Sequence, residues 1–287
     1  MWVPDADVFP TGSAGEPDSL RVWYPWVLQE DDGTLLMWYS GSDGQTPRIL
    51  SAIRRPGEAW ERRGVEIDAG CAGETDGYGV EAPCVVRTPG GYLMVYGGFD
   101  GEVSRLHMAT SRDARHWSCH GTILQRGPED MLGASHPCLL LSGAHWWLFY
   151  TGYRSQGGRS RGAVLAAISD NGASWDRLGP VLQPAPEEHA ASHPCVLDIE
   201  RELQMFYTLE ARNTVTIALA TSPDGVTWNR RGSLLPFPSK PGEKHPINTP
   251  CVVRLLDGSL RMWYAELEAY DRREGYRIRT AHFAGEP

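Results

Sequence analysis

The 287-residue sequence lacks the features of several protein classes. It has no run of about 20 apolar residues, so it predicts no membrane helix and no membrane partner. The N-terminal segment has neither a basic region nor an apolar run, which gives no sign of a signal peptide and favours a cytoplasmic location. Basic residues number 27 against 36 acidic ones, and the net charge of −9 argues against nucleic acid as a partner.

Cysteine is also scarce, with six residues and no CxxC pair, which excludes a zinc ribbon. Since no secretory signal is visible, we expect all six cysteines to be reduced. They are Cys71, Cys84, Cys119, Cys138, Cys195 and Cys251. No segment is convincingly helical, and 32 glycines with 21 prolines are too many turn-forming residues for a helical bundle.

The chain repeats itself at intervals of 54 to 58 residues. Each repeat starts with a proline inside a short segment: Trp23–Val27, Glu81–Val85, Ser135–Leu139, Ser192–Val196 and Asn248–Val252. Each proline is followed by an apolar run that contains a tyrosine: Tyr39, Tyr96, Tyr150, Tyr207 and Tyr264. In the first four repeats a third strand, a polar turn ending in tryptophan and a fourth strand follow, with Trp60, Trp117, Trp175 and Trp228 at the turns. Each unit therefore reads as four short strands.

Several four-stranded units in succession predict an all-β, five-bladed β-propeller that forms a single domain. The expected units cover residues 20–68, 80–125, 134–183, 191–236 and 247–283. The fifth unit stops after its third strand, so we expect residues 2–10 to supply its fourth strand and close the ring. Two β-sandwich domains are the alternative, but sandwiches do not repeat at this regular interval.

In such a blade the start of the first strand and the end of the second share one face, where we expect the functional site. The residues before the prolines would converge there near the axis, and they differ between units. They are Trp23 and Tyr24, Glu81 and Ala82, Ser135 and His136, Ser192 and His193, and Asn248 and Thr249. The alternatives to a site are an inter-unit salt bridge for Glu81 and ring-lining histidines bonded to backbone or water. The cysteine after four of the prolines favours core packing over a catalytic thiol.

The loops after the tyrosines add charged candidates on the same face. The acidic ones are Asp43, Asp100, Glu210, Glu266, Glu268 and Asp271. The basic ones are Arg154, Arg159, Arg161, Arg212, Arg272 and Arg273. Guanidinium groups pair with carboxylate or phosphate, so these arginines indicate either an ion-paired rim or an anionic substrate.

The pattern resembles the five-bladed propellers of glycoside hydrolase families 32, 43, 62, 68 and 130. The resemblance spans the chain and rests on the five units, on strand motifs such as LMVYGG and WLFYTG, and on a Ser-x-Asp-Gly-x-x-Trp turn at Ser222–Trp228 with looser forms at Ser111–Trp117 and Ser169–Trp175. In those families a glutamate shortly before a proline serves as the acid, which Glu81 matches. The first unit, however, carries Trp23 and Tyr24 where the families have a carboxylate, and later units carry histidines.

The resemblance implies a carbohydrate-active enzyme that acts on a polar or anionic sugar, or on a metabolite that contains one, without a required cofactor. In this hypothesis Glu81 is the general acid, Asp100 or Glu210 is the base, and Trp23, Tyr24 and Trp26 stack on a sugar ring. Arg154, Asn248 and Glu266 are the further substrate-binding candidates. A second hypothesis is a lyase, isomerase or cyclase that uses His136, His193 and Glu81, with a divalent metal as an optional cofactor. A third is a sugar-binding propeller without chemistry. The composition is compatible with a bacterial source.

Overall fold

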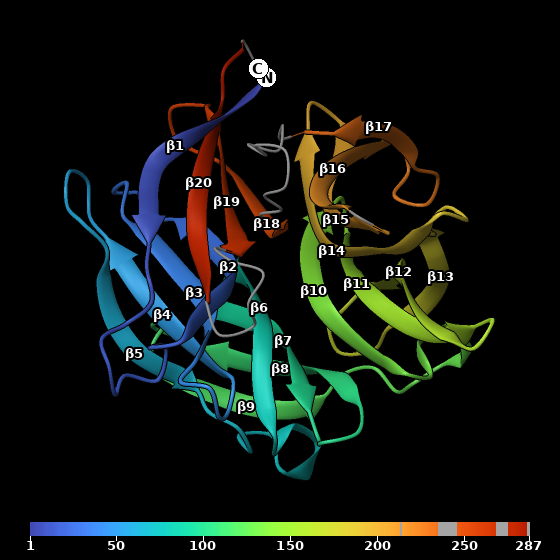
Figure 1. Cartoon of the computed structure of the whole chain (residues 1–287), viewed down its shortest axis with the longest axis horizontal. Helices are drawn as coiled ribbons and strands as arrows, with labels where there is room; N and C mark the ends of the chain where they lie inside the picture. The colour runs from blue at the N-terminus through green and yellow to red at the C-terminus, as the bar shows by residue number, and fades with distance from the viewer. Residues whose placement is uncertain (213, 235–245, 268–274, 286–287) are drawn as a thin grey trace.

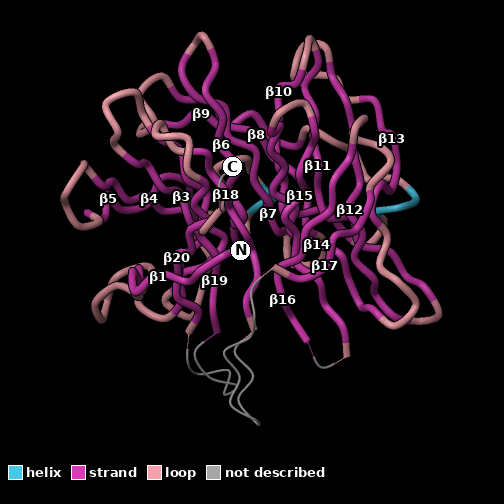
Figure 2. Tube along the Cα trace, turned by 90° about the horizontal axis from the view of Figure 1, so that it is seen from above, coloured by secondary structure: helices cyan, strands magenta, loops and turns pink. Residues whose placement is uncertain are grey.

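The computed structural model describes residues 1–212, 214–234, 246–267 and 275–285. This part of the chain is almost entirely strand, with two single-turn 3-10 helices at Glu74–Asp76 and Pro128–Asp130 (Figure 2). The predicted all-β class is therefore confirmed. None of the described residues forms a helix that is long and apolar enough to cross a membrane.

The strands pair into four-stranded antiparallel units that follow the predicted repeats. Unit one contains β2 (Arg21–Gln29), β3 (Leu35–Ser42), β4 (Arg48–Arg54) and β5 (Glu61–Ile67). Unit two contains β6 (Gly79–Thr88), β7 (Gly91–Phe99), β8 (Ser104–Ser111) and β9 (Trp117–Thr122). Unit three contains β10 (Gly133–Ser142), β11 (His145–Gln156), β12 (Arg159–Ser169) and β13 (Asp176–Leu182). Unit four contains β14 (Glu188–Ile199), β15 (Glu202–Ala211), β16 (Thr214–Ser222) and β17 (Asn229–Ser233). Units three and four are connected by one parallel bridge, between Gly162 and Ala190.

The last unit is completed by the N-terminal strand, as predicted. It contains β18 (Ile247–Arg254), β19 (Leu260–Leu267) and β20 (Tyr276–Phe283), and β1 (Trp2–Phe9) pairs antiparallel with β20. The inner strands β2, β6, β10, β14 and β18 contact one another in a closed cycle around a common axis (Figure 1). The sheet edges at the two ends of the chain are thereby paired with each other, which is how a propeller avoids open edges.

Neighbouring inner strands are joined by a repeated contact at the position after the proline. The buried Sγ atoms of four cysteines accept backbone N–H groups of the following unit at 3.1–3.2 Å. These cysteines are Cys84, Cys138, Cys195 and Cys251. Unit one has Trp26 there instead, and its indole Nε1 donates to Val85 O at 2.7 Å. Core packing of the four cysteines is thus confirmed.

The remaining two cysteines correct the prediction that all six are reduced. A disulfide joins Cys71, in the connection before β6, to Cys119 on β9, across a separation of 48 residues. Sequence spacing did not indicate this pair, because the two residues belong to segments that only the folded unit brings together.

Candidate active site

The residue directly before each inner-strand proline has an unusual backbone conformation. The five φ angles lie between 52° and 54°, which is in the left-handed region that residues other than glycine rarely adopt. At the same point the pairing register with the second strand shifts, so each inner strand has a β-bulge there. The residues are Tyr24, Ala82, His136, His193 and Thr249. The bulge gives these residues a different direction from the residues just before them.

The side chains at the two positions before the prolines consequently line two different cavities: the position next to the proline lines the smaller one, and in units one, two and five the position before it lines the larger one. The larger cavity, of about 400 Å³, opens over unit one between units two and five. It is lined by Leu20, Arg21, Trp23, Tyr24, Ser42, Gly44, Gln45, Pro47, Glu81, Asn248 and Tyr276. Its volume lies within the range of small-molecule sites. Four predicted site residues therefore come together here: Trp23, Tyr24, Glu81 and Asn248.

Glu81 has the electrostatics of a proton donor. Burial raises the pKa of its carboxyl from 4.5 to about 7, since removal from water disfavours the charged form, and a hydrogen bond from the Trp23 side chain opposes the rise only in part. Glu81 is thus partly protonated at neutral pH. The carboxamide Oδ1 of Asn248 is buried and has no hydrogen-bond partner among the described residues.

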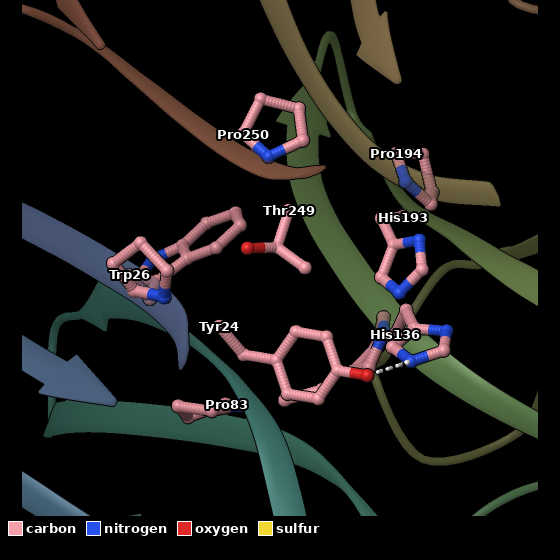
Figure 3. A pocket seen from close by; sticks show the side chains of 11 residues that line it. Tyr24, Trp26, Pro83, His136, His193, Pro194, Thr249 and Pro250 are labelled. Atoms are coloured by element: carbon pink, nitrogen blue, oxygen red, sulfur yellow. Dashed lines mark hydrogen bonds between the residues drawn. The ribbon is translucent and has the colours of Figure 1, made fainter. Parts of the chain in front are cut away.

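The smaller cavity lies on the axis and contains the histidines (Figure 3). The rings of His136 and His193 lie 3.7 Å apart between centroids, and Tyr24 packs against both. Tyr24 Oη and His136 Nε2 share a hydrogen bond of 3.2 Å. The chamber has a volume of about 30 Å³, which is room for a water molecule and not for a substrate. Tyr24 lines both cavities and separates the histidines from Glu81.

Burial controls the ionisation of this group. It lowers the pKa of His193 to about 3 and the pKa of His136 well below its usual value, to which the nearby His193 also contributes. Burial raises the pKa of the Tyr24 hydroxyl well above its usual value, and the Glu81 carboxylate adds to the rise. At neutral pH both imidazoles and the phenol are uncharged, so Tyr24 is unsuited to act as a phenolate nucleophile.

Glu210 lies on β15 and contacts Ser192, the residue before His193. Ser192 Oγ lies 3.4 Å from Glu210 Oε1 and 2.7 Å from His193 Nδ1, which links the carboxylate to the histidine pair. Burial raises the pKa of Glu210, opposed by the Ser192 hydrogen bond and by His189. Burial raises the pKa of the Tyr153 hydroxyl as well, and the negative charges of Glu210 and Glu81 raise it further. Tyr153 is therefore close enough to both carboxylates to be affected by their charge.

Several predicted residues lie outside the larger cavity. Asp100 accepts hydrogen bonds from its own loop and pairs with Arg105, and these contacts lower its pKa. Arg154 pairs with Glu129 at 2.5 Å, and Glu266 pairs with Arg279 at 2.6 Å. The predicted Glu268, Asp271, Arg272 and Arg273 lie outside the described residues.

Trp26 occupies the axis and not the mouth. Its indole packs against the hydrophobic clusters of the whole ring, so its aromatic surface is used for packing. Among the described residues no group of three His, Cys, Asp or Glu side chains is arranged to hold a metal ion. The metal-dependent hypothesis therefore has no geometric support from Glu81, His136 and His193.

Sequence reasoning missed Tyr276, Gln45 and Tyr153. For Tyr153 a signal was present: Ser42, Tyr153 and Glu210 each stand three residues after the tyrosine of their second strand. Ser42 lines the larger cavity, Tyr153 packs against His136, and Glu210 contacts Ser192. Glu266 stands two residues after its tyrosine and Asp100 four, and each pairs with an arginine instead. In a strand, odd and even offsets face opposite sides.

Comparison with known proteins gives one family match. A family model described as the glycosyl hydrolases family 32 N-terminal domain matches residues 90–245. Uncharacterized protein MT1551 of Mycobacterium tuberculosis strain CDC 1551 / Oshkosh is 35% identical over 117 residues, and uncharacterized protein Rv1502 of strain ATCC 25618 / H37Rv is 34% identical over 117 residues. Each match covers 38% of this chain and 38% of the relative, so the chain matches well under half the length of these relatives.

Solved structures show a similar fold along the whole chain. A protein described as a glycoside hydrolase has a TM-score of 0.79 at 18% identity, covering 99% of this chain and 94% of its own. A thermostable family-43 glycoside hydrolase has a TM-score of 0.76 at 14% identity, covering 96% and 94%. A GH130 protein, from a family described as mannoside phosphorylases that contains hydrolases of β-1,2-mannosidic linkages in Candida mannan, has a TM-score of 0.72 at 15% identity, covering 99% and 98%. At these identities the likeness shows the propeller fold alone.

Proposed function

Because the chain belongs to the family of the glycosyl hydrolase family 32 N-terminal domain, we propose that it is a carbohydrate-active enzyme that hydrolyses a glycosidic bond on a five-bladed propeller. The observation that carries this proposal is Glu81. Its carboxyl lines a cavity of about 400 Å³, and burial raises its pKa to about 7, so it can hold a proton at the pH at which it must donate one.

The proposed reaction uses two carboxyl groups. Glu81 donates its proton to the glycosidic oxygen as that oxygen leaves the anomeric carbon. Glu210 takes a proton from the water that attacks the anomeric carbon, which leaves a free sugar and an alcohol. Glu210 is favoured over Asp100 for this role because Asp100 is held by Arg105 and its own loop. By contrast, Glu210 acts on the lining of the cavity: burial raises the pKa of Tyr24, which lines it, and both Glu81 and Glu210 add to the rise.

The rest of the lining fits a polar ring. Trp23 offers an aromatic face beside Glu81, while Asn248 and Gln45 offer amide groups. Arg21 is the cationic side chain in the lining. It is the residue that supports an anionic sugar, because it lines this cavity and Arg154 does not.

A sugar-binding protein without chemistry is the second candidate. It is favoured by Trp23 and Tyr24, which stand where related enzymes have a carboxylate, and by the fact that Glu81 is the one carboxylate in the lining of the cavity. Such a protein would bind a sugar in the larger cavity and would leave the glycosidic bond intact.

The test is Glu81→Gln, assayed for release of reducing sugar from a panel of oligosaccharides. Loss of a general acid should reduce turnover by roughly 10²- to 10⁴-fold. The wild-type rate should fall as the pH rises through about 7, because the acid then loses its proton. Glu202→Gln, on the opposite face, is the control and should retain activity. Unchanged turnover in Glu81→Gln would overturn the assignment, and binding without turnover in the wild type would favour the second candidate.

A further inference from the structure

The face that bears the cavities is unevenly apolar. Large hydrophobic side chains that are exposed in the loops of this face, among the described residues, belong to units two and three alone. They are Tyr78 (68% exposed), Phe99 (39%), Met131 (54%) and Leu132 (48%). The other exposed hydrophobic side chains lie on outer strands, at the N-terminus, or in the turns and strand ends of the opposite face, where Leu141 lies at the end of the inner strand β10. Exposed apolar side chains that gather in neighbouring loops of one face are typical of a binding surface.

Tyr78 and Phe99 form a supported pair, which we name the aromatic platform. Their ring centroids lie 6.4 Å apart at an interplanar angle of 76°, and Tyr78 N donates to Phe99 O at 2.9 Å. The Tyr78 ring lies directly over Gly101, where a Cβ atom would come within 3.1 Å of it. Gly101 has a φ of 99°, a conformation suited to glycine.

The hairpin beneath the platform is held by polar contacts. The Asp100 carboxylate accepts the backbone N–H groups of Glu102 and Val103 and pairs with Arg105. Asp100 thereby supports the loop that carries Phe99 and Gly101. The rings are presented on a preformed loop, which lowers the entropy that a ligand would have to overcome on binding.

The loop that carries the platform adjoins a loop of unit three. Leu132 N donates to Tyr153 O at 2.9 Å, and a Cβ atom on Gly133 would lie 3.3 Å from Ser104 O of unit two, so the two loops adjoin. On the other side, Tyr78 precedes Glu81 by three residues of extended chain, a span of about 10 Å. The platform and the carboxyl of Glu81 are therefore presented by the same short segment.

We propose that the aromatic platform, flanked by Met131 and Leu132, binds a sugar unit of the leaving group, so that the substrate is an oligosaccharide whose terminal unit occupies the 400 Å³ cavity. This inference rests on the proposed function. The scissile bond lies beside Glu81, and the platform lies at the start of the strand that bears Glu81. An exposed tyrosine ring suits the apolar face of a sugar, because it contributes apolar contact while its hydroxyl stays in water.

The test compares two kinds of substrate for Tyr78→Ala and for the double variant Tyr78→Ala/Phe99→Ala. Glycosyl fluorides have no sugar in the leaving group, whereas di- and trisaccharides of the same sugar do. The variants should lose about tenfold in kcat/KM on the oligosaccharides, chiefly through KM, and should keep wild-type rates on the fluoride. Leu256→Ala, 65% exposed on the opposite face, is the matched control and should resemble the wild type. Equal effects on both substrates, or none on either, would overturn the proposal.

A binding measurement separates this proposal from the proposed function. Electrophoresis through gels that contain polysaccharide should retard the wild type, Glu81→Gln and Leu256→Ala but not the double platform variant. If the wild type binds through the platform yet hydrolyses nothing, the proposed function fails while the platform stands as a sugar site. If sedimentation instead shows that the platform variants break a dimer and leave glycan binding unchanged, the patch is a contact between copies and the proposal is wrong.

Discussion

The residue before each inner-strand proline adopts a left-handed conformation in every unit, although none of these residues is glycine. Such conformations persist where their surroundings hold them. In three units the backbone N–H of this residue donates to a hydroxyl of the preceding unit at 2.9–3.0 Å, as His193 N does to Thr151 Oγ1. Because of this local geometry, the side chains of His136 and His193 point into the smaller cavity on the axis, whereas Glu81 lines the larger cavity.

Glu81 should make stability depend on pH in a definite direction. Its folded-state pKa of about 7 exceeds the usual 4.5, so between these values the folded chain binds more protons than the unfolded chain. Its contribution to stability is complete below pH 4.5 and is lost as the pH rises through 7, by at most about 1.4 kcal/mol for each pKa unit. Urea unfolding from pH 4 to 8 should show a smaller loss in Glu81→Gln than in the wild type. Parallel pH profiles would contradict the assignment.

Within the units, strands are linked by a repeated contact in which a buried aspartate binds a tyrosine and an arginine. In unit one the buried Asp18 accepts hydrogen bonds from Tyr39 on β3 at 2.9 Å and from Arg62 on β5 at 2.8 Å. Unit three has the same contact between Asp130, Tyr150 and Arg177. In units one and three the arginine of this contact pairs in register with an alanine of the third strand. In unit two Asp76 binds Tyr96 in the same way, but the residue that pairs with the corresponding alanine is Cys119 and not an arginine. The Cys71–Cys119 disulfide therefore replaces an ion pair with a covalent link.

Removal of this link should destabilise the protein. Cys71→Ser/Cys119→Ser should lose roughly 2–4 kcal/mol in the free energy of unfolding, because the unfolded chain is no longer constrained. Urea unfolding of the wild type with and without reductant measures the same quantity. The double variant is the control and should not respond to reductant. A wild type that is equally stable in both conditions would show that the link contributes nothing.

At the scale of the whole molecule, the ring is symmetric in its strands and asymmetric in its centre. Four units place a cysteine after the proline, and unit one places Trp26, which fills the axis and contacts every hydrophobic cluster. One large side chain thus closes the middle of the ring. The larger cavity consequently lies to one side, over unit one, instead of on the axis.

Trp26→Ala should be among the most damaging core substitutions. A large-to-small change at a central position costs about 3–5 kcal/mol, because the surrounding strands cannot collapse into the space. Trp26→Phe retains packing but loses the hydrogen bond to Val85 O, so it should cost less. Trp60→Ala, at the edge of one unit, is the comparison for a tryptophan that belongs to a single cluster. Thermal and urea unfolding measure all three, and a loss for Trp26→Ala no larger than for Trp60→Ala would contradict the axial role.

Much of the architecture could be predicted from the sequence. The spacing of the prolines and of tyrosines such as Tyr39 and Tyr96 defined the strands of each unit, because every unit must bury the same faces against its neighbours. The missing fourth strand at the end of the chain predicted that β1 would pair with β20. Burial of the cysteines after the prolines was also predictable, since the inner strands leave little room.

The arrangement of the candidate site could not be predicted from the repeat. Sequence reasoning grouped Glu81 with His136 and His193, yet these residues stand at different positions before their prolines. Because each inner strand has a bulge with a left-handed residue, the side chain of one position points into the larger cavity and that of the next points towards the axis. The Cys71–Cys119 pair likewise depended on a connection folding back on β9.

The sequence by itself determined how the strands repeat and where the ring closes, because these follow from local patterns of apolar residues and turns. The tertiary structure decided which polar groups share a cavity, which ones pair with each other and which aromatic ring fills the axis. Those outcomes depend on side-chain directions and on contacts between distant segments, which local patterns do not fix.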